Sequence, residues 1–209
     1  MTSPGPTTIC ATLPFARSSM YSHRTVRSKH GCHRYQTTTS RPTWAECLRD
    51  VHLATDGALT VFRDDVVTSN GIGFSPDGGT LYHSESTVGL WAWRRDTAGM
   101  PVDRRLLVPL DDCDGIAVDV EGHIWVAFWR QGAIVRFRPD GTIERRIALP
   151  VPRVTSLAFG GPDRRDLHVT VGGDDDAPDV GGVIRLRTEV PGLPTQRSRF
   201  NTGRRLAQA

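Results

Sequence analysis

The chain has 209 residues, a formal net charge of +3 and 38% hydrophobic residues, so its length allows one domain with a tail. This charge is too small to indicate a nucleic-acid partner, and the sequence contains no run of about 18 apolar residues that would predict a membrane span. The four cysteines (Cys10, Cys32, Cys47 and Cys113) form no CxxC pair, and their spacing favours a reducing, cytoplasmic compartment.

Residues 1–50 differ in composition from the rest of the chain. They are rich in Ser, Thr and Arg, hold seven basic residues against two acidic ones, and show no sustained hydrophobic period. This composition predicts an irregular segment, which is either a disordered leader or translated sequence that is not the natural N-terminus. An organelle transit peptide is the alternative interpretation. Residues 201–209 are expected to form a frayed tail.

From residue 51 onward, short apolar runs alternate with turn signals. The tripeptides Pro76–Asp77–Gly78, Glu121–Gly122–His123 and Pro139–Asp140–Gly141 separate runs that are rich in Val, Ile, Leu, Phe and Trp. Proline, aspartate and glycine each favour a different position of a tight turn. Residues 51–200 are therefore predicted to form strands and hairpins.

The predicted strands repeat. The segments 70–86, 114–130 and 155–171 resemble one another and begin at Asn70, Asp114 and Thr155. A period of about 40–45 residues with four strands per unit is typical of a propeller blade. The fold expected is all-β, a partial β-propeller of about three to four blades. The apolar residues expected between the blades are Ile72, Phe74, Ile116, Val118, Leu157 and Phe159.

A ring of this kind is incomplete, because closed propellers carry about 4–8 blades. Three explanations stay open. Residues 1–50 contribute strands that their sequence does not reveal, the chain is a fragment, or two chains complete one ring.

Two oxygen-bearing side chains occupy the same place in successive repeats. Asn70 and Asp114 stand just ahead of the predicted inner strands, which line the channel of a propeller. An amide oxygen and a carboxylate that converge there could hold a hard cation such as Ca²⁺ or Mg²⁺, and Thr155 and Ser156 bring hydroxyls to the third copy. The alternative is a turn, since Asn–Gly and Asp–Gly are common turn pairs.

Four phrases resemble those of the gluconolactonase/regucalcin family: SNGIGFSPDGGTLYHSES at 69–86, CDGIAVDVEGHIWVAFWRQGAIVRFRPDG at 113–141, TSLAFGGPDRRDLHVTV at 155–171 and GGVIRLRTEVPGLPTQRSRF at 181–200. The resemblance implies a six-bladed propeller that holds a divalent cation (Ca²⁺, Zn²⁺, Mn²⁺ or Mg²⁺) and hydrolyses sugar lactones. It also implies that Asn70 and Asp114 ligate the metal and that Asp114 is the catalytic proton acceptor.

The chain departs from the family pattern in three places. The family's first metal ligand, a Glu in an "EGP" context, has no match, since Glu46 lies in WAECLRD. The Arg-x-Asn-Asp phrase that helps to bind substrate is absent, and Glu85 replaces an Asp. These departures favour a truncated and impaired sugar-lactone hydrolase. The alternative is a non-catalytic propeller remnant that acts as a binding module.

Four tryptophans in the predicted strands could stack on a sugar, namely Trp91, Trp93, Trp125 and Trp129. Their alternating positions favour packing between blades instead.

Overall fold

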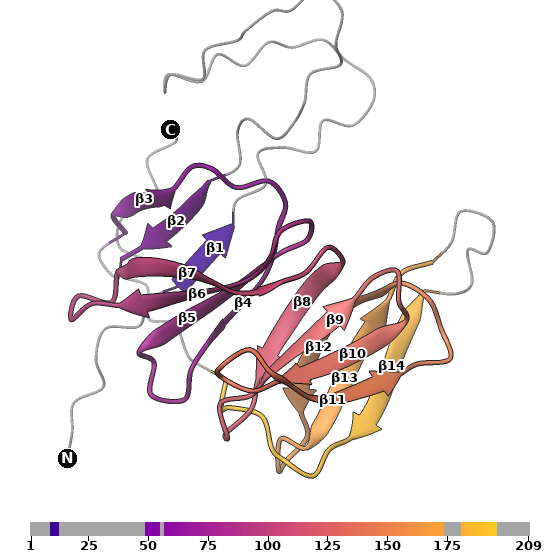
Figure 1. The fold of residues 1–209 in the computed structure, drawn as a ribbon. Coiled ribbons are helices and arrows are strands. Elements are labelled where there is room, and N and C mark those ends of the chain that lie inside the picture. Colours follow the sequence, from indigo (N-terminus) through magenta and orange to yellow (C-terminus); the bar gives the residue numbers. More distant parts are fainter. Residues whose placement is uncertain (1–8, 13–48, 55–56, 174–180, 196–209) are drawn as a thin grey trace, which may run out of the picture. The chain divides into compact units, whose positions relative to one another are not determined.

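The computed structural model describes residues 9–12, 49–54, 57–173 and 181–195, and within these ranges the regular structure is all β-strand (Figure 1). The chain divides into two compact units. One comprises Met1–Val67 with Ser198–Ala209, and the other comprises Thr68–Arg197. Within the described ranges, no helix is long and apolar enough to span a bilayer.

The first unit contains a three-stranded antiparallel sheet of order β1-β2-β3. Its strands are β1 (Ile9–Thr12), β2 (Asp50–Leu53) and β3 (Leu59–Arg63). A strand thus lies within the segment that was expected to be irregular. Residues 13–48 and 201–209 lie outside the described residues, so the disordered leader and the tail stay predictions.

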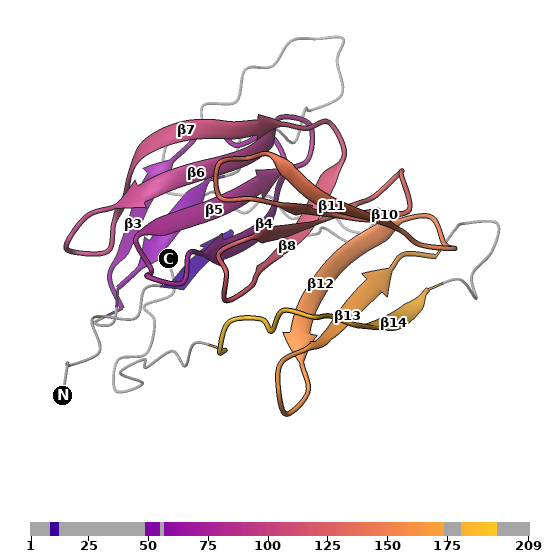
Figure 2. The same ribbon diagram turned by 60° about the horizontal axis from the view of Figure 1, so that its bottom comes forward.

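The second unit is built from three consecutive antiparallel sheets (Figures 1 and 2). Its strands are β4 (Ser69–Phe74), β5 (Thr80–Glu85), β6 (Gly89–Arg95), β7 (Pro101–Pro109), β8 (Cys113–Val118), β9 (Ile124–Phe128), β10 (Ala133–Phe137), β11 (Ile143–Ala148), β12 (Val154–Gly160), β13 (Asp166–Val171) and β14 (Gly182–Arg187). In each sheet, strands that are neighbours in sequence pair with one another, and the first strands of the sheets (β4, β8 and β12) contact in turn. These sheets are propeller blades, and the predicted all-β, partial-propeller fold is confirmed.

The predicted turns form between the strands. Gly78 and Gly141 adopt φ values of 71° and 91°, a left-handed conformation that glycine accepts at little cost. In the first of these turns, Asp77 accepts a hydrogen bond from the Gly79 N–H at 3.0 Å. Proline, aspartate and glycine therefore take the turn positions that their chemistry suggests.

The core lies between successive blades, and β9 contributes to it from both faces. Ile124, Val126 and Phe128 pack with β8 and the first blade, whereas Trp125 and Ala127 pack with the third. Such alternation follows from the two-residue period of a strand.

The predicted core residues fall into two groups. Ile116, Val118 and Leu157 are buried, and Phe159 is partly buried against the same core. Ile72 and Phe74 are half-buried. They lie on the face of β4 away from β8, because Gly73 between them faces Val118.

Candidate functional site

Asn70 and Asp114 occupy matching irregularities in two inner strands. In β4 the pairing steps from Ser69↔Glu85 to Ile72↔His83, and in β8 it steps from Cys113↔Phe128 to Ile116↔Val126. Each inner strand therefore carries one extra residue, a β-bulge, at the position of the candidate ligand. Bulges re-aim side chains and are frequent beside active sites.

The third inner strand repeats this feature with a different side chain. In β12 the pairing steps from Val154↔Val171 to Ser156↔Thr170, so Thr155 is the extra residue. The Thr155 hydroxyl hydrogen-bonds the Thr170 hydroxyl at 2.6 Å. The sequence repeat thus marks a repeated bulge, which the sequence analysis did not predict.

The turn interpretation of Asn70–Gly71 and Asp114–Gly115 is wrong, because both pairs lie within strands. The glycines permit close approach of the inner strands. A Cβ atom on Gly71 would lie 2.4 Å from the main-chain nitrogen of Ile116, and one on Gly115 would lie 2.3 Å from Ser156 Oγ. No larger residue fits without a backbone shift.

A buried serine hydroxyl joins the two ligand-bearing strands. Ser84 Oγ accepts a hydrogen bond from the Gly71 N–H at 2.7 Å and donates one to the main-chain carbonyl of Asp114. Ser84 is fully buried. Its hydroxyl therefore links the main chain next to Asn70 to the main chain of Asp114 through two hydrogen bonds.

The Asp114 carboxyl is partly withdrawn from water. Desolvation raises its pKa to about 6 from the ordinary 3.8, the Gly115 N–H opposes the shift, and the nearby charge of Asp112 adds to it. The Asp112 carboxylate itself accepts hydrogen bonds from the main-chain N–H of Arg130 (2.8 Å) and from its guanidinium (3.1 Å). The pKa of Asp114 is thus raised mainly because the carboxyl group is withdrawn from water.

Asn70 is exposed, and its Nδ2 donates a hydrogen bond to Ser86 Oγ. This bond assigns the amide nitrogen to Ser86, so Oδ1 is the atom that can ligate a cation. Asn70 Oδ1 and the Asp114 carboxylate are oxygen donors of the kind that Ca²⁺ and Mg²⁺ prefer. Their chemistry fits a divalent cation, although Ca²⁺ takes about six to eight oxygens and these two residues supply only part of that number.

A second group of possible ligands consists of Asp119, Glu121 and His123, whose ligand atoms lie within 4.8 Å of one another. The Arg136 guanidinium already neutralises the two acids, at 2.7 Å from a carboxylate oxygen of each. Asp119 also accepts a hydrogen bond from Trp125 Nε1 at 2.9 Å. This cluster is accordingly an ion-pair network around the buried Asp119 and Arg136, in which the guanidinium takes the place of a metal.

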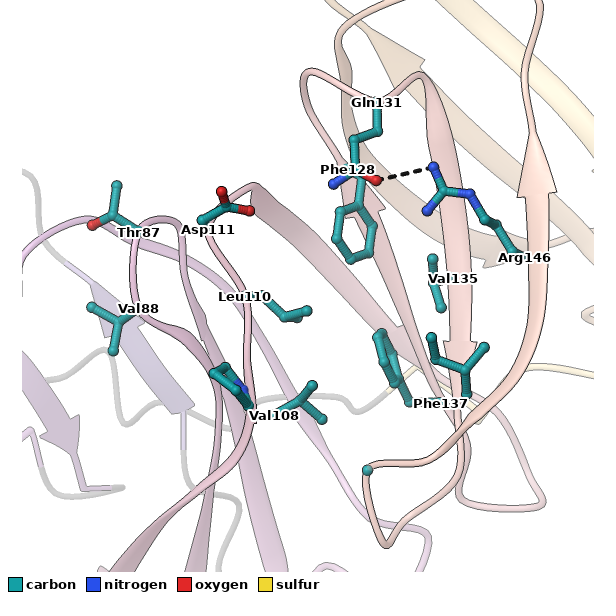
Figure 3. A pocket seen from close by; sticks show the side chains of 13 residues that line it. Thr87, Val88, Val108, Leu110, Asp111, Phe128, Gln131, Val135, Phe137 and Arg146 are labelled. Atoms are coloured by element: carbon teal, nitrogen blue, oxygen red, sulfur yellow. Dashed lines mark hydrogen bonds between the residues drawn. The ribbon is translucent and has the colours of Figure 1, made fainter.

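A hollow of about 430 Å³ opens beside Asp114. It is lined by Ser86, Thr87, Asp111, Asp112, Cys113, Asp114, Trp129 and Arg130. A larger hollow of about 720 Å³ lies over β7, β10 and β11 (Figure 3). Its lining is mainly apolar, with Leu110, Phe128 and Phe137 pointing into it. It therefore has fewer acidic and basic side chains for catalysis than the smaller hollow.

Comparisons with known proteins identify the family to which the chain is similar. A family model described as "SMP-30/Gluconolactonase/LRE-like region" matches residues 31–173. Pentonolactonase XacC of Haloferax volcanii is 35% identical over 168 residues, which cover 72% of this chain and 58% of that protein. 6-Deoxy-6-sulfogluconolactonase of Pseudomonas putida is 36% identical over 145 residues, covering 63% and 50%.

Among solved structures, a calcium-binding protein, regucalcin, from Agrobacterium tumefaciens superposes with a TM-score of 0.64 and 32% identity. The match covers 71% of this chain and 55% of that one. The chain thus spans about half the length of the relatives it matches.

Proposed function

This chain belongs to the SMP-30/gluconolactonase/LRE-like family, and we propose that it carries part of the cation and substrate site of a sugar-lactone hydrolase. The observation that carries the proposal is the pair of matching bulges that present Asn70 and Asp114 from adjacent inner strands. Two relatives named as lactonases, acting on a pentonolactone and on a sulfogluconolactone, support sugar lactones as the substrate class.

Asn70 Oδ1 and the Asp114 carboxylate would hold the divalent cation, which is Ca²⁺, Zn²⁺, Mn²⁺ or Mg²⁺. When bound, the cation polarises the lactone carbonyl as a Lewis acid. A relative described as calcium-binding supports a cation as part of the proposed activity.

Asp114 would take the proton of the attacking water. In the cation-free chain its pKa is about 6, so its carboxylate is ionised at neutral pH, and a bound cation would favour the ionised form further. Asp112, which faces the same hollow, is occupied by Arg130 and is less suited to this role. Transfer to Asp114 would leave hydroxide to form the new bond to the lactone carbonyl carbon. The ring C–O bond would then break, and the proton would pass from Asp114 to the ring oxygen, which becomes a hydroxyl group of the product acid.

We further propose that this chain alone turns over lactone poorly. The described residues give the cation two protein ligands, and the sequence lacks both the family's first Glu ligand and its Arg-x-Asn-Asp phrase. A cation held by few ligands binds weakly. The same ligand count favours the second candidate function, a non-catalytic propeller module that binds a cation or a partner without turnover.

Proton release from a sugar lactone with Mn²⁺ present tests the proposal. Slight hydrolysis that Asp114→Asn abolishes would support the lactonase, and joining a family-type first half to the chain should increase the rate. The matched control is Glu189→Ala, which removes an exposed carboxylate outside the hollow. The proposal would be contradicted if neither the chain alone nor the chain joined to a family-type first half hydrolysed the lactone. Hydrolysis that Asp114→Asn leaves unchanged would also contradict it. Cation binding without turnover in both forms would support the binding module.

A further inference from the structure

Trp129 differs from the other described tryptophans in its exposure. Trp93 and Trp125 are 6% and 3% exposed, and Trp125 belongs to the core between the second and third blades. Trp91 is half-buried, and its indole N–H donates to the Glu85 carboxylate at 2.9 Å. Trp129 is 36% exposed and lines the hollow that contains Asp114. The expectation that these rings pack between blades thus fits Trp125 but not Trp129.

The exposed indole is held in place from the protein side. The Arg153 guanidinium lies over the Trp129 ring, 5.6 Å from its centroid, and donates a hydrogen bond to the Gly173 carbonyl at 2.6 Å. A Cβ atom on Gly172 would lie 3.0 Å from the ring, so the main chain lies close against the indole. The main-chain N–H of Trp129 donates to the Asp112 carbonyl at 3.2 Å. An aromatic ring fixed in this way can bind a ligand without first being ordered.

We propose that the exposed surface of the Trp129 indole forms the apolar wall of the lactone-binding hollow and selects ring-shaped, polyhydroxylated substrates. A sugar lactone carries C–H groups on its ring faces and hydroxyl groups around its rim. The hollow offers an aromatic surface together with carboxylate, hydroxyl and guanidinium groups, from Trp129, Asp111, Thr87 and Arg130. This inference rests on the proposed function and names a specificity residue for it.

The test measures binding of a sugar lactam, in which a ring N–H replaces the ring oxygen and slows hydrolysis. Calorimetry with Mn²⁺ present would compare the unmodified chain with Trp129→Ala, Trp129→Phe and Leu106→Ala. Leu106 is another exposed apolar residue, on β7 and outside the hollow. We expect about two- to twelve-fold weaker binding in Trp129→Ala and near-normal binding in Trp129→Phe and Leu106→Ala, since an aromatic contact contributes about 0.5–1.5 kcal/mol.

Fluorescence gives a second readout that loss of structure would not imitate. Lactam binding should change the tryptophan emission of the unmodified chain, and the change should vanish in Trp129→Phe although binding persists. Unchanged affinity in Trp129→Ala, an unchanged fluorescence response in Trp129→Phe, or no lactam binding at all would overturn the inference. Cation affinity should be the same in all Trp129 variants. Failure of the proposed function gives a different result: Asp114→Asn would then leave the Mn²⁺ affinity unaltered.

Discussion

The hydroxyl group of Ser84 donates a hydrogen bond to the main-chain carbonyl of Asp114, which belongs to the next blade. The same oxygen accepts from the N–H of Gly71, the residue after Asn70. One buried side chain on β5 thus ties together the two inner strands that carry the candidate cation ligands. We therefore expect Ser84, which is not itself a candidate ligand, to help set the spacing between Asn70 and Asp114.

Ser84→Ala should weaken both the fold and the site. It would leave the Gly71 N–H and the Asp114 carbonyl without their shared partner, at a cost of about 1–3 kcal/mol in the free energy of unfolding. We also expect a several-fold loss of Mn²⁺ affinity by calorimetry. The control is Ser75→Ala, which removes a serine hydroxyl from a turn. Equal cation affinity in the two variants would show that Ser84 does not position the ligands.

Gly115→Ala should destabilise the second unit, because the added Cβ would lie 2.7 Å from the Cα atom of Ser156 and the backbone would have to move. Overpacking of this kind costs about 1–3 kcal/mol. The matched control is Gly182→Ala, where a Cβ would meet no atom within 4 Å. Urea unfolding of both variants checks the difference, and equal midpoints would mean that the inner strands are not as close as described.

Arg136→Met should be strongly destabilising and should not alter cation binding. Asp119 is fully buried, and its charge is balanced by Arg136 at 2.7 Å. Breaking such a pair from one side costs about 3–5 kcal/mol. Arg187→Met is the control, since its ion pair with Asp163 is largely exposed and should matter little. Mn²⁺ binding that Asp119→Asn removes would show instead that this cluster is a metal site.

The free energy of unfolding of the cation-free chain should depend on pH through the titration of Asp114. Its folded-state pKa, about 6, lies above the ordinary 3.8, so its contribution to stability is present below about pH 4 and is lost as the pH rises through about 6. The stability of Asp114→Asn relative to the unmodified chain should therefore increase from pH 4 to pH 7, roughly the interval that contains both pKa values. Asp77→Asn should change little over this interval, because the Ser75 hydroxyl lowers the pKa of that carboxyl and its contribution to stability is lost only below about pH 4. Urea unfolding with a chelator present measures both, and a difference for Asp114→Asn that is independent of pH would contradict this assignment.

The sequence predicted the blades well because the period of 44 and 41 residues and the Pro–Asp–Gly turns are local signals. It could not predict the bulges at Asn70 and Asp114, since a bulge is defined by pairing with a second strand. For the same reason Asn–Gly and Asp–Gly could be taken for turns. The link through Ser84 joins residues 30 positions apart and leaves no pattern in a single sequence.

Exposure was equally hard to predict from alternation alone. Trp125 and Trp129 both come from the second blade, yet one is buried and the other is exposed. Trp129 follows the last residue of β9, where the sheet no longer covers both faces. The Arg136 network was likewise missed, because it gathers acids from a turn and from β11 around one guanidinium.

Calorimetric titration of the full chain with Mn²⁺ tests the central claim most directly. We expect weak binding at one site, lost in Asp114→Ala, reduced at least ten-fold in Asn70→Ala, and unchanged in Glu189→Ala. Loss in both ligand variants would show that the two bulges present a shared cation site, because truncating either ligand removes a coordinating oxygen. Binding that persists in Asp114→Ala and Asn70→Ala, or no binding in the unmodified chain, would contradict the account.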